Sequence, residues 1–335
     1  MIATKQKNDK TVVNDRARAL RKKDGFSREF SKYKWVYFMA LPGIIYYLVF
    51  CYAPMFGVLI GFQDFKYASG ITNSDWVGLK HIFKFIFQSK GTAINYSVIN
   101  PDFVRTVGNT VVISFMNLII GFPAPIILAL LLNEIKSSGY KRVVQTITYI
   151  PHFISTVIIC GMISRFSMKA GLFNAVLGWF GFPAENLLLK PEAFKWIYVL
   201  SDLWQQIGWN SIIYLAALSG IDPTLYEAAS IDGAGKFRQV FTVTLPAIIP
   251  TIVTLFIMRL GSMISVGSDK VLLLYNDMTM ETADVISTYV YRKSFYEGTN
   301  YSYSTAIGLF NSLVNICFLT AGNAISRKVA ETSLW

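Results

Sequence analysis

Apolar residues in this chain are concentrated in runs that approach the length needed to cross a lipid bilayer. The sequence has 335 residues, of which 53% are hydrophobic and 15% are charged, whereas a soluble domain of this size carries roughly a quarter charged residues. A spanning helix needs about 20 mainly apolar residues. Six runs come near or above this length, at about residues 35–62, 106–132, 144–164, 194–218, 245–266 and 304–325. The sequence therefore predicts an all-α, multi-pass membrane protein with about six transmembrane helices.

The distribution of basic residues predicts which side of the membrane the ends occupy. The net charge is +11, and Lys and Arg are concentrated in residues 1–34 and in short segments between the predicted spans. With the N-terminus inside, the inner segments have roughly twice the basic-residue density of the outer ones, as cytoplasmic segments do. An even number of spans then places both termini in the cytoplasm. We expect residues 1–34 to form a basic cytoplasmic segment near anionic membrane lipid, and residues 35–335 to form one transmembrane domain. Because the charge follows the membrane topology, we expect no nucleic-acid partner.

No arrangement of residues in the sequence suits catalysis or metal binding. Cys51, Cys160 and Cys317 all fall in apolar segments and share no ligand spacing with His81 or His152. A membrane enzyme would need a nucleophile, a metal cluster or paired acids near the membrane face. The stretch 233–236 reads Gly-Ala-Gly-Lys, but a P-loop needs Ser or Thr after the Gly-Lys pair and an earlier Gly. We predict that this chain is not an enzyme and holds neither a metal nor a cofactor.

A short polar island between the fourth and fifth predicted spans contains the most specific pattern in the chain. It reads Glu227-Ala-Ala, three residues, Gly233, nine residues, Val243, one residue and then Leu245-Pro246. The preceding Asp-Pro pair at 222–223 suits a helix start, because Asp caps free backbone amides and Pro fits the first turn. The glycines at 233 and 235 permit a sharp turn. The pattern predicts a hairpin of two short helices that can dock into a groove on a cytoplasmic partner.

This pattern resembles the EAA loop of binding-protein-dependent ABC importers, the cytoplasmic hairpin through which a permease subunit contacts its ATPase. The one difference is Val243, at a position where Ile is usual. The resemblance implies that residues 222–246 form the coupling loop, and that closure of two ATPase subunits on ATP moves the spans as rigid bodies. ATP and Mg would be bound by those partner subunits. The residues implied in coupling are Glu227, Ala228, Ala229, Asp232, Gly233, Leu245 and Pro246.

The resemblance covers nearly the whole chain after residue 34. Segments similar to the carbohydrate-uptake branch of these permeases, the branch of maltose, alginate and rhamnogalacturonan permeases, begin at Leu41, Gly61, Trp76, Asn109 and Pro151, and segments similar to a sub-branch for complex, often acidic oligosaccharides begin at Lys270 and Ala283. The resemblance implies a type I ABC importer permease fold in a bacterial inner membrane. It also implies as partners a homologous second permease forming a heterodimer, two ATPase subunits, an extracellular solute-binding protein and an oligosaccharide.

An ion-coupled secondary sugar transporter is the main alternative. Such a protein is expected to show internal repeats, interrupted spans and buried carboxylates for ion coupling. Asp202 is the one plausible buried carboxylate, and this alternative gives no reason for the pattern that starts at Glu227. The sequence therefore favours the ATP-driven importer.

A candidate sugar site follows from the same resemblance. The run 201–227 is similar to the helix before the coupling loop in oligosaccharide permeases, one face of which lines the translocation cavity. The next span adds a charged residue at a position that lines the sugar cavity in relatives, with a serine nearby. The residues implied are Asp202, Gln205, Gln206, Trp209, Arg259 and Ser262. The first four have spacings of three, four and seven, which place them on one side of a helix.

Arg259 lies deep in an apolar run, where an ionisable side chain is expensive and by default functional. Arg can bind a carboxylate through two parallel hydrogen bonds, so one hypothesis is that the substrate contains uronate groups. The other is that Arg259 pairs internally, with Asp202 or with the second subunit. Both stay open at this stage. Buried Asn residues at 109, 117 and 133 are expected to bond neighbouring helices.

Overall fold

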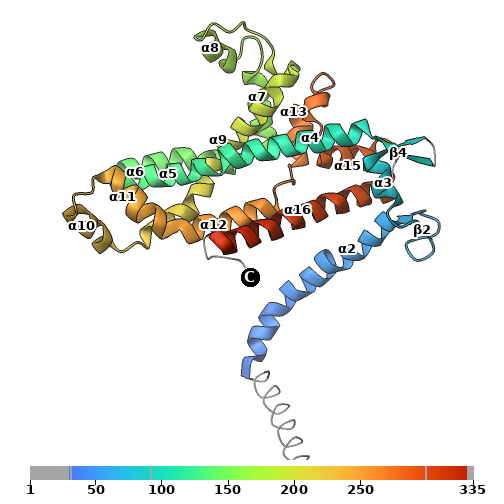
Figure 1. The fold of residues 1–335 in the computed structure, drawn as a ribbon, viewed down its shortest axis with the longest axis horizontal. Helices are drawn as coiled ribbons and strands as arrows, with labels where there is room; N and C mark the ends of the chain where they lie inside the picture. The colour runs from blue at the N-terminus through green and yellow to red at the C-terminus, as the bar shows by residue number, and fades with distance from the viewer. Residues whose placement is uncertain (1–29, 31, 91–92, 299, 330–335) are drawn as a thin grey trace, which may run out of the picture. The chain divides into compact units, whose positions relative to one another are not determined.

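The computed structural model describes residues 30, 32–90, 93–298 and 300–329, and Figure 1 draws its ribbon. The chain divides into two compact units, residues 1–59 and 60–335. In the first unit the described residues form a helix that passes into the π-helix η1 (Tyr47–Tyr52) and the short helix α2 (Ala53–Met55). Most of the predicted basic segment 1–34 lies outside the described residues.

The second unit is mainly helical. Its elements, in chain order from the end of the first unit, are η2 (Phe56–Phe62), β1 (Gln63–Asp64), β2 (Asp75–Trp76), α3 (Lys80–Ile86), β3 (Phe87–Lys90), β4 (Ala93–Ile99), α4 (Pro101–Met116), η3 (Asn117–Gly121), α5 (Pro123–Glu134), α6 (Ser138–Tyr149), η4 (Ile150–Phe153), α7 (Thr156–Phe166), α8 (Leu172–Gly178), η5 (Leu187–Leu189), α9 (Pro191–Ser219), α10 (Pro223–Ile231), α11 (Lys236–Gln239), η6 (Val240–Thr244), α12 (Leu245–Gly261), α13 (Ser268–Leu274), α14 (Met280–Ala283), α15 (Ile286–Phe295) and α16 (Tyr301–Val329). The strands form two antiparallel pairs, β1 with β2 and β3 with β4. The all-α prediction therefore omits two small hairpins between the first two predicted spans.

Four helical stretches among the described residues are long and apolar enough to cross a membrane, namely Lys32–Phe62, Pro101–Glu134, Lys236–Gly261 and Tyr301–Lys328. They match the first, second, fifth and sixth predicted runs. The third run is broken, because Ser138–Phe153 and Thr156–Phe166 meet at a bend of 100°. Pro151 lies at this bend in η4, and its missing backbone N–H favours a break in the helix.

The fourth predicted run corresponds to α9, which differs from the prediction in composition. At 29 residues it is long enough to span a membrane, but it is not among the stretches apolar enough to do so. α9 packs against α5, α6 and α12 of its own unit. Its middle turns contain the polar residues Asp202, Gln205, Gln206 and Asn210. An inner helix with a polar face needs a polar surface or a water-filled cavity beside it rather than lipid.

Three groups of buried apolar side chains hold the second unit together. One joins α7, α9 and α13, a second joins α3, α15 and α16, and a third joins α5, α9 and α12. Their members include Ile159, Cys160, Val199 and Val271 in the first, Phe85, Tyr289 and Ile307 in the second, and Ala129, Tyr214 and Ile248 in the third. The first group packs α13 on α7, and this contact positions the cavity described below.

Paired charges also fasten α4 to α15, which lie side by side (Figure 1). The Asp284 side chain is fully buried. Arg292 donates to both of its carboxylate oxygens, at 3.2 and 2.8 Å, and Nη2 of Arg105 donates to Oδ2 at 3.2 Å. We call Asp284, Arg105 and Arg292 the Asp284 cluster. Asn109 donates to the backbone carbonyl of Asp284 at 3.0 Å, so this asparagine bonds a neighbouring segment as predicted.

Candidate functional site

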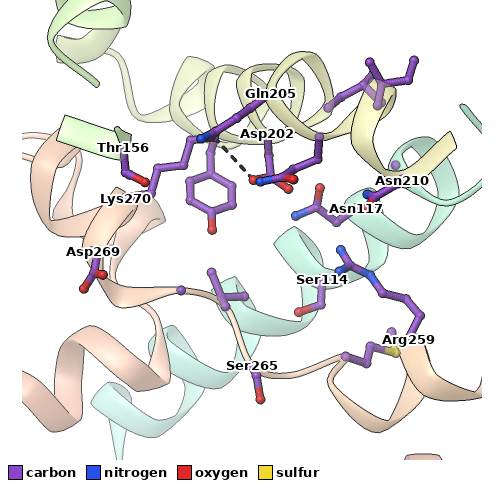
Figure 2. A pocket seen from close by; sticks show the side chains of 18 residues that line it. Ser114, Asn117, Thr156, Asp202, Gln205, Asn210, Arg259, Ser265, Asp269 and Lys270 are labelled. Carbon is purple, nitrogen blue, oxygen red and sulfur yellow. Dashed lines mark hydrogen bonds and ion pairs between the residues drawn. The ribbon is translucent and has the colours of Figure 1, made fainter. Parts of the chain in front are cut away.

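A cavity of about 430 Å³ lies between α4, α9, the end of α12 and α13 (Figure 2). Its polar lining residues are Ser114, Asn117, Thr156, Asp202, Gln205, Gln206, Asn210, Arg259, Ser265, Asp269 and Lys270. Small-molecule sites are usually lined mainly by apolar side chains. Because this wall consists largely of amides, hydroxyls and charged groups, it suits a ligand rich in polar groups.

Three of the four α9 residues predicted to face a cavity do so in the structure. Asp202, Gln205 and Gln206 line the cavity, together with Asn210 one turn further on. Trp209 lies instead against His152, with the two rings 4.3 Å apart and nearly parallel at 3°. Nδ1 of His152 is 2.9 Å from Oε1 of Gln206. With His152 donating, this contact leaves the Gln206 amide N–H groups free for a ligand.

Arg259 lines the cavity, and it also lines a smaller adjoining cavity of about 250 Å³ that contains Ser262. The Ser262 hydroxyl donates to the backbone carbonyl of Arg259 at 3.3 Å, so this serine lies beside the arginine but outside the main cavity. No acidic side chain of the described residues comes within 4.0 Å of the Arg259 guanidinium. The internal pair between Arg259 and Asp202 considered from the sequence is therefore not formed in this structure.

Asp202 pairs with Lys270, a residue that the sequence interpretation missed. Nζ of Lys270 is 3.5 Å from Oδ1 of Asp202, and the lysine side chain is only 7% exposed. Burial lowers the pKa of Lys270, and the Asp202 carboxylate opposes this effect. The signal available in the sequence was a single lysine that opens the apolar run Val271–Leu274. That signal was weak because α13 is 68 residues from its partner.

Two polar atoms at the cavity wall have unmet hydrogen-bonding capacity. Oγ of Ser114 and Oδ1 of Asn117 are buried and have no hydrogen-bond partner among the described residues. A buried polar atom without a partner is expensive. Unlike Asn109, Asn117 lines the cavity.

The predicted hairpin has the expected geometry. Asp222 caps α10 by accepting a hydrogen bond from the Thr224 amide at 2.9 Å, and this bond lowers the pKa of the Asp222 carboxyl. The chain reverses at Gly233, whose φ of +76° favours glycine. Gln239 closes the hairpin by donating to Oγ of Ser230 at 2.8 Å. The second short helix is not separate, because α11 continues through η6 into α12 without a break.

The hairpin exposes apolar side chains. Ile231 is 87% exposed and Phe237 is 80% exposed, and Leu225 and Phe241 are also exposed. Of the residues implied in coupling, Glu227, Ala228, Asp232, Gly233 and Pro246 are exposed, whereas Ala229 and Leu245 are half-buried. No ion pair of Glu227 is formed with the described residues. An exposed apolar group around a charged residue is typical of a protein-binding surface.

The part of the chain that the structure describes contains no group of three or more His, Cys, Asp or Glu side chains that could hold a metal ion. The side chains that line the cavity offer hydrogen bonds and ion pairs.

The family model described as "Binding-protein-dependent transport system inner membrane component" matches residues 121–331. The chain is 41% identical over 303 residues to the polygalacturonan/rhamnogalacturonan transport system permease protein YteP of Bacillus subtilis, covering 90% of each chain. It is 30% identical over 236 residues to the arabinooligosaccharides transport system permease protein AraP of the same organism, covering 69% of each.

Two solved structures are also similar. One is described as a bacterial alginate ABC transporter in complex with alginate pentasaccharide-bound periplasmic protein; its matching chain has a TM-score of 0.79 and 39% identity, over 92% of this chain and 99% of that chain. The other is described as a bacterial ABC transporter involved in the import of the acidic polysaccharide alginate; it has a TM-score of 0.78 and 40% identity, over 90% and 98%.

Proposed function

Since this chain belongs to the family of binding-protein-dependent transport system inner membrane components, it is a multi-pass membrane permease, and we propose that it imports an acidic, uronate-containing oligosaccharide. The family and the relatives are those of sugar and oligosaccharide ABC importers. An ion-coupled transporter is therefore not retained as an alternative. The substrate, its binding residues and the coupling residues are the proposed part.

The environment of Arg259 supports an acidic substrate. Its guanidinium reaches a polar cavity without an acidic partner among the described residues. A guanidinium binds a carboxylate through two parallel hydrogen bonds. In agreement with an acidic substrate, one relative is named for polygalacturonan and rhamnogalacturonan. One similar structure is described as a transporter involved in the import of an acidic polysaccharide. The amides of Gln206 and Asn210 would hold sugar hydroxyls.

The hairpin 222–246 supports coupling to ATPase subunits. Its exposed Ile231 and Phe237 would bury apolar area in a groove of an ATPase, and Glu227 would pair with a cation or a helix N-terminus there. Closure of two ATPase subunits, which bind ATP and Mg, would move α12 through the continuous helix that begins at Lys236. We infer a location in a bacterial inner membrane, with a homologous second permease and an external binding protein completing the complex.

The experiment uses the complete importer reconstituted in lipid nanodiscs with its binding protein. ATP hydrolysis would be measured with the galacturonate trimer and with the same trimer after its carboxyl groups are reduced to alcohols. We expect the acidic trimer to stimulate hydrolysis. Arg259→Gln should weaken the response to the acidic trimer roughly tenfold and leave the neutral response unchanged, because one charge-assisted contact is lost.

Glu227→Ala tests the coupling loop in the same assay and should reduce stimulation by either sugar. Glu192→Ala, which removes an exposed carboxylate from the first turn of α9, is the matched control and should behave like the wild type. Stimulation by the neutral trimer alone would rule out the acidic substrate. Normal stimulation in Glu227→Ala would rule out the proposed role of that residue.

A further inference from the structure

Lys270 brings a cation into the cavity from an apolar stretch of chain. Val271 and Leu274 of α13 are buried in the same group as Ile159 and Cys160 of α7, which fixes the helix in place. The ammonium group reaches the cavity from a different side than Arg259 does (Figure 2). With its side chain 7% exposed, this cation has lost most of its water. A buried charge is expensive unless it is paired, so Lys270 requires an anion nearby.

The anion that Lys270 has in this structure is held loosely. Nζ lies 3.5 Å from Oδ1 of Asp202, whereas a charge-assisted hydrogen bond between N and O is usually about 2.7–2.9 Å long. Arg292 and Asp284 approach to 2.8 Å in the Asp284 cluster. The Asp202 side chain is also 29% exposed, so water can solvate it when the pair opens. Asp202 therefore can leave the lysine at small cost.

We propose that Lys270 is a second carboxylate-binding cation of the cavity, and that Asp202 is the counter-ion which a substrate carboxylate replaces. This inference rests on the proposed import of an acidic oligosaccharide. When a uronate enters, its carboxylate takes the place of Asp202 beside the ammonium, and Asp202 turns toward the solvated part of the cavity. The cation stays compensated at every stage.

This exchange selects against neutral sugars. A neutral sugar has no charge with which to displace Asp202, so the pair stays closed. Arg259, which lacks an acidic partner among the described residues, can bind a carboxylate without any exchange. Asp269, the other acidic residue of the cavity wall, is exposed and forms no ion pair with the described residues. The two cations together match a ligand with at least two uronate units.

The test uses the same reconstituted importer and the two trimers, comparing half-maximal concentrations for stimulation of ATP hydrolysis. Lys270→Met should raise this concentration for galacturonate trimer roughly tenfold or more, with the carboxyl-reduced trimer changed less than twofold. Lys270→Arg, which keeps the charge, should restore most of the acidic response. Lys169→Met, which removes an exposed lysine beyond α7, is the matched control and should have no effect.

Two further variants distinguish a purely structural ion pair from a substrate-binding role of Lys270. They are Asp202→Asn and the double variant that combines Asp202→Asn with Lys270→Met. If the pair is only structural, each single change leaves a buried charge uncompensated and the double change relieves this, so the double variant should recover. If Lys270 binds substrate, Asp202→Asn should respond to the acidic trimer at an equal or lower concentration than the wild type. The double variant should then be as defective as Lys270→Met.

The outcomes separate this inference from the proposed function. Recovery in the double variant, or equal weakening of both trimers in Lys270→Met, would overturn the role of Lys270. If Arg259→Gln loses the acidic response while Lys270→Met keeps it, the inference falls and the acidic substrate stands. If the wild type does not distinguish the two trimers, the acidic substrate and the role of Lys270 fall together.

Discussion

The Asp284 cluster and the cavity both contain charged side chains, but they pair those charges differently. In the Asp284 cluster a fully buried carboxylate meets two guanidinium groups at 2.8 and 3.2 Å. In the cavity, Lys270 meets its carboxylate at 3.5 Å, and Arg259 has no acidic group of the described residues within 4.0 Å.

The difference separates charges that are compensated within the chain from charges that can pair with a ligand. Buried ions with short, multiple contacts are compensated within the chain, and removing one of them leaves the others less well compensated. Ions with long or missing contacts can be compensated by a ligand or another chain. Such groups in a cavity are candidates for a functional site. The pairing geometry therefore agrees with a structural role for Asp284 and with the binding role proposed for Arg259.

The largest effect is expected from Asp284→Ala. Removal of the shared carboxylate takes three charge-assisted hydrogen bonds from Arg105 and Arg292, each worth about 1.5–3 kcal/mol. Arg105 keeps its ion pair with Asp102, and Arg292 keeps its ion pair with Glu297. We expect a marked fall in thermal unfolding temperature of the purified complex. Asp277→Ala removes an exposed carboxylate from the same segment and should leave the unfolding temperature unchanged. Equal stability of the two variants would contradict the structural role.

Two matched arginine variants sharpen the comparison. Arg292→Gln removes the hydrogen bonds to both Asp284 oxygens and should destabilise the protein by roughly 2 kcal/mol. The molecules that remain folded should keep their preference for acidic sugars. Arg259→Gln should do the reverse, with an unchanged unfolding temperature and a weakened acidic response. Unfolding scans and ATPase stimulation on both variants measure the two effects. The distinction fails if both variants lose stability alike.

Much of the fold could be predicted from the sequence because the bilayer imposes a length. The runs at 35–62 and 106–132 correspond to helices at Lys32–Phe62 and Pro101–Glu134. Local chemistry also predicted the Asp222 cap and the turn at Gly233. The bend at Pro151 was not predicted, because tertiary packing decides whether a proline kinks a helix or breaks it.

The site was predicted only in part, because helical periodicity defines a face but not its neighbours. Asp202, Gln205 and Gln206 share the cavity wall with Arg259. Trp209 fits the same periodicity, yet its ring packs on His152, since the bend places that histidine next to α9. Lys270 and the Asp284 cluster depend on contacts across 68 and 179 residues. No local pattern encodes such pairs.

Gly208→Ala tests whether the cavity depends on helix packing rather than on ion pairs. A Cβ at Gly208 would lie 2.1 Å from the backbone oxygen of Thr148 in α6, so α9 must shift at a cost of about 1–3 kcal/mol. We expect a modest fall in unfolding temperature together with a weaker acidic response. Gly161→Ala, on α7 with no atom within 4 Å of the added Cβ, is the control. An unchanged acidic response in Gly208→Ala would show that the cavity tolerates movement of α9.

The smallest effect is expected for His81, a buried titratable residue whose ring is only partly paired. Its Nε2 contacts the backbone oxygen of Gln63 at 3.1 Å, while the buried Nδ1 has no hydrogen-bond partner among the described residues. Burial lowers the pKa of His81 below its usual 6.5, although the Gln63 carbonyl and nearby Asp64 oppose the effect. A proton on Nδ1 would add a second buried N–H donor, and this one would have no acceptor.

Because the folded-state pKa of His81 lies below that of the unfolded chain, its contribution to stability is complete above pH 6.5. It is lost as the pH falls from there through the folded-state pKa, since the unfolded chain takes up the proton first. His81→Gln keeps a donor for the Gln63 carbonyl but cannot be protonated. We expect this variant to lose less stability than the wild type between pH 6.5 and pH 5, as measured by unfolding temperature. The same acid sensitivity in both proteins would mean that the charge on His81 is compensated after all, as charges are in the Asp284 cluster.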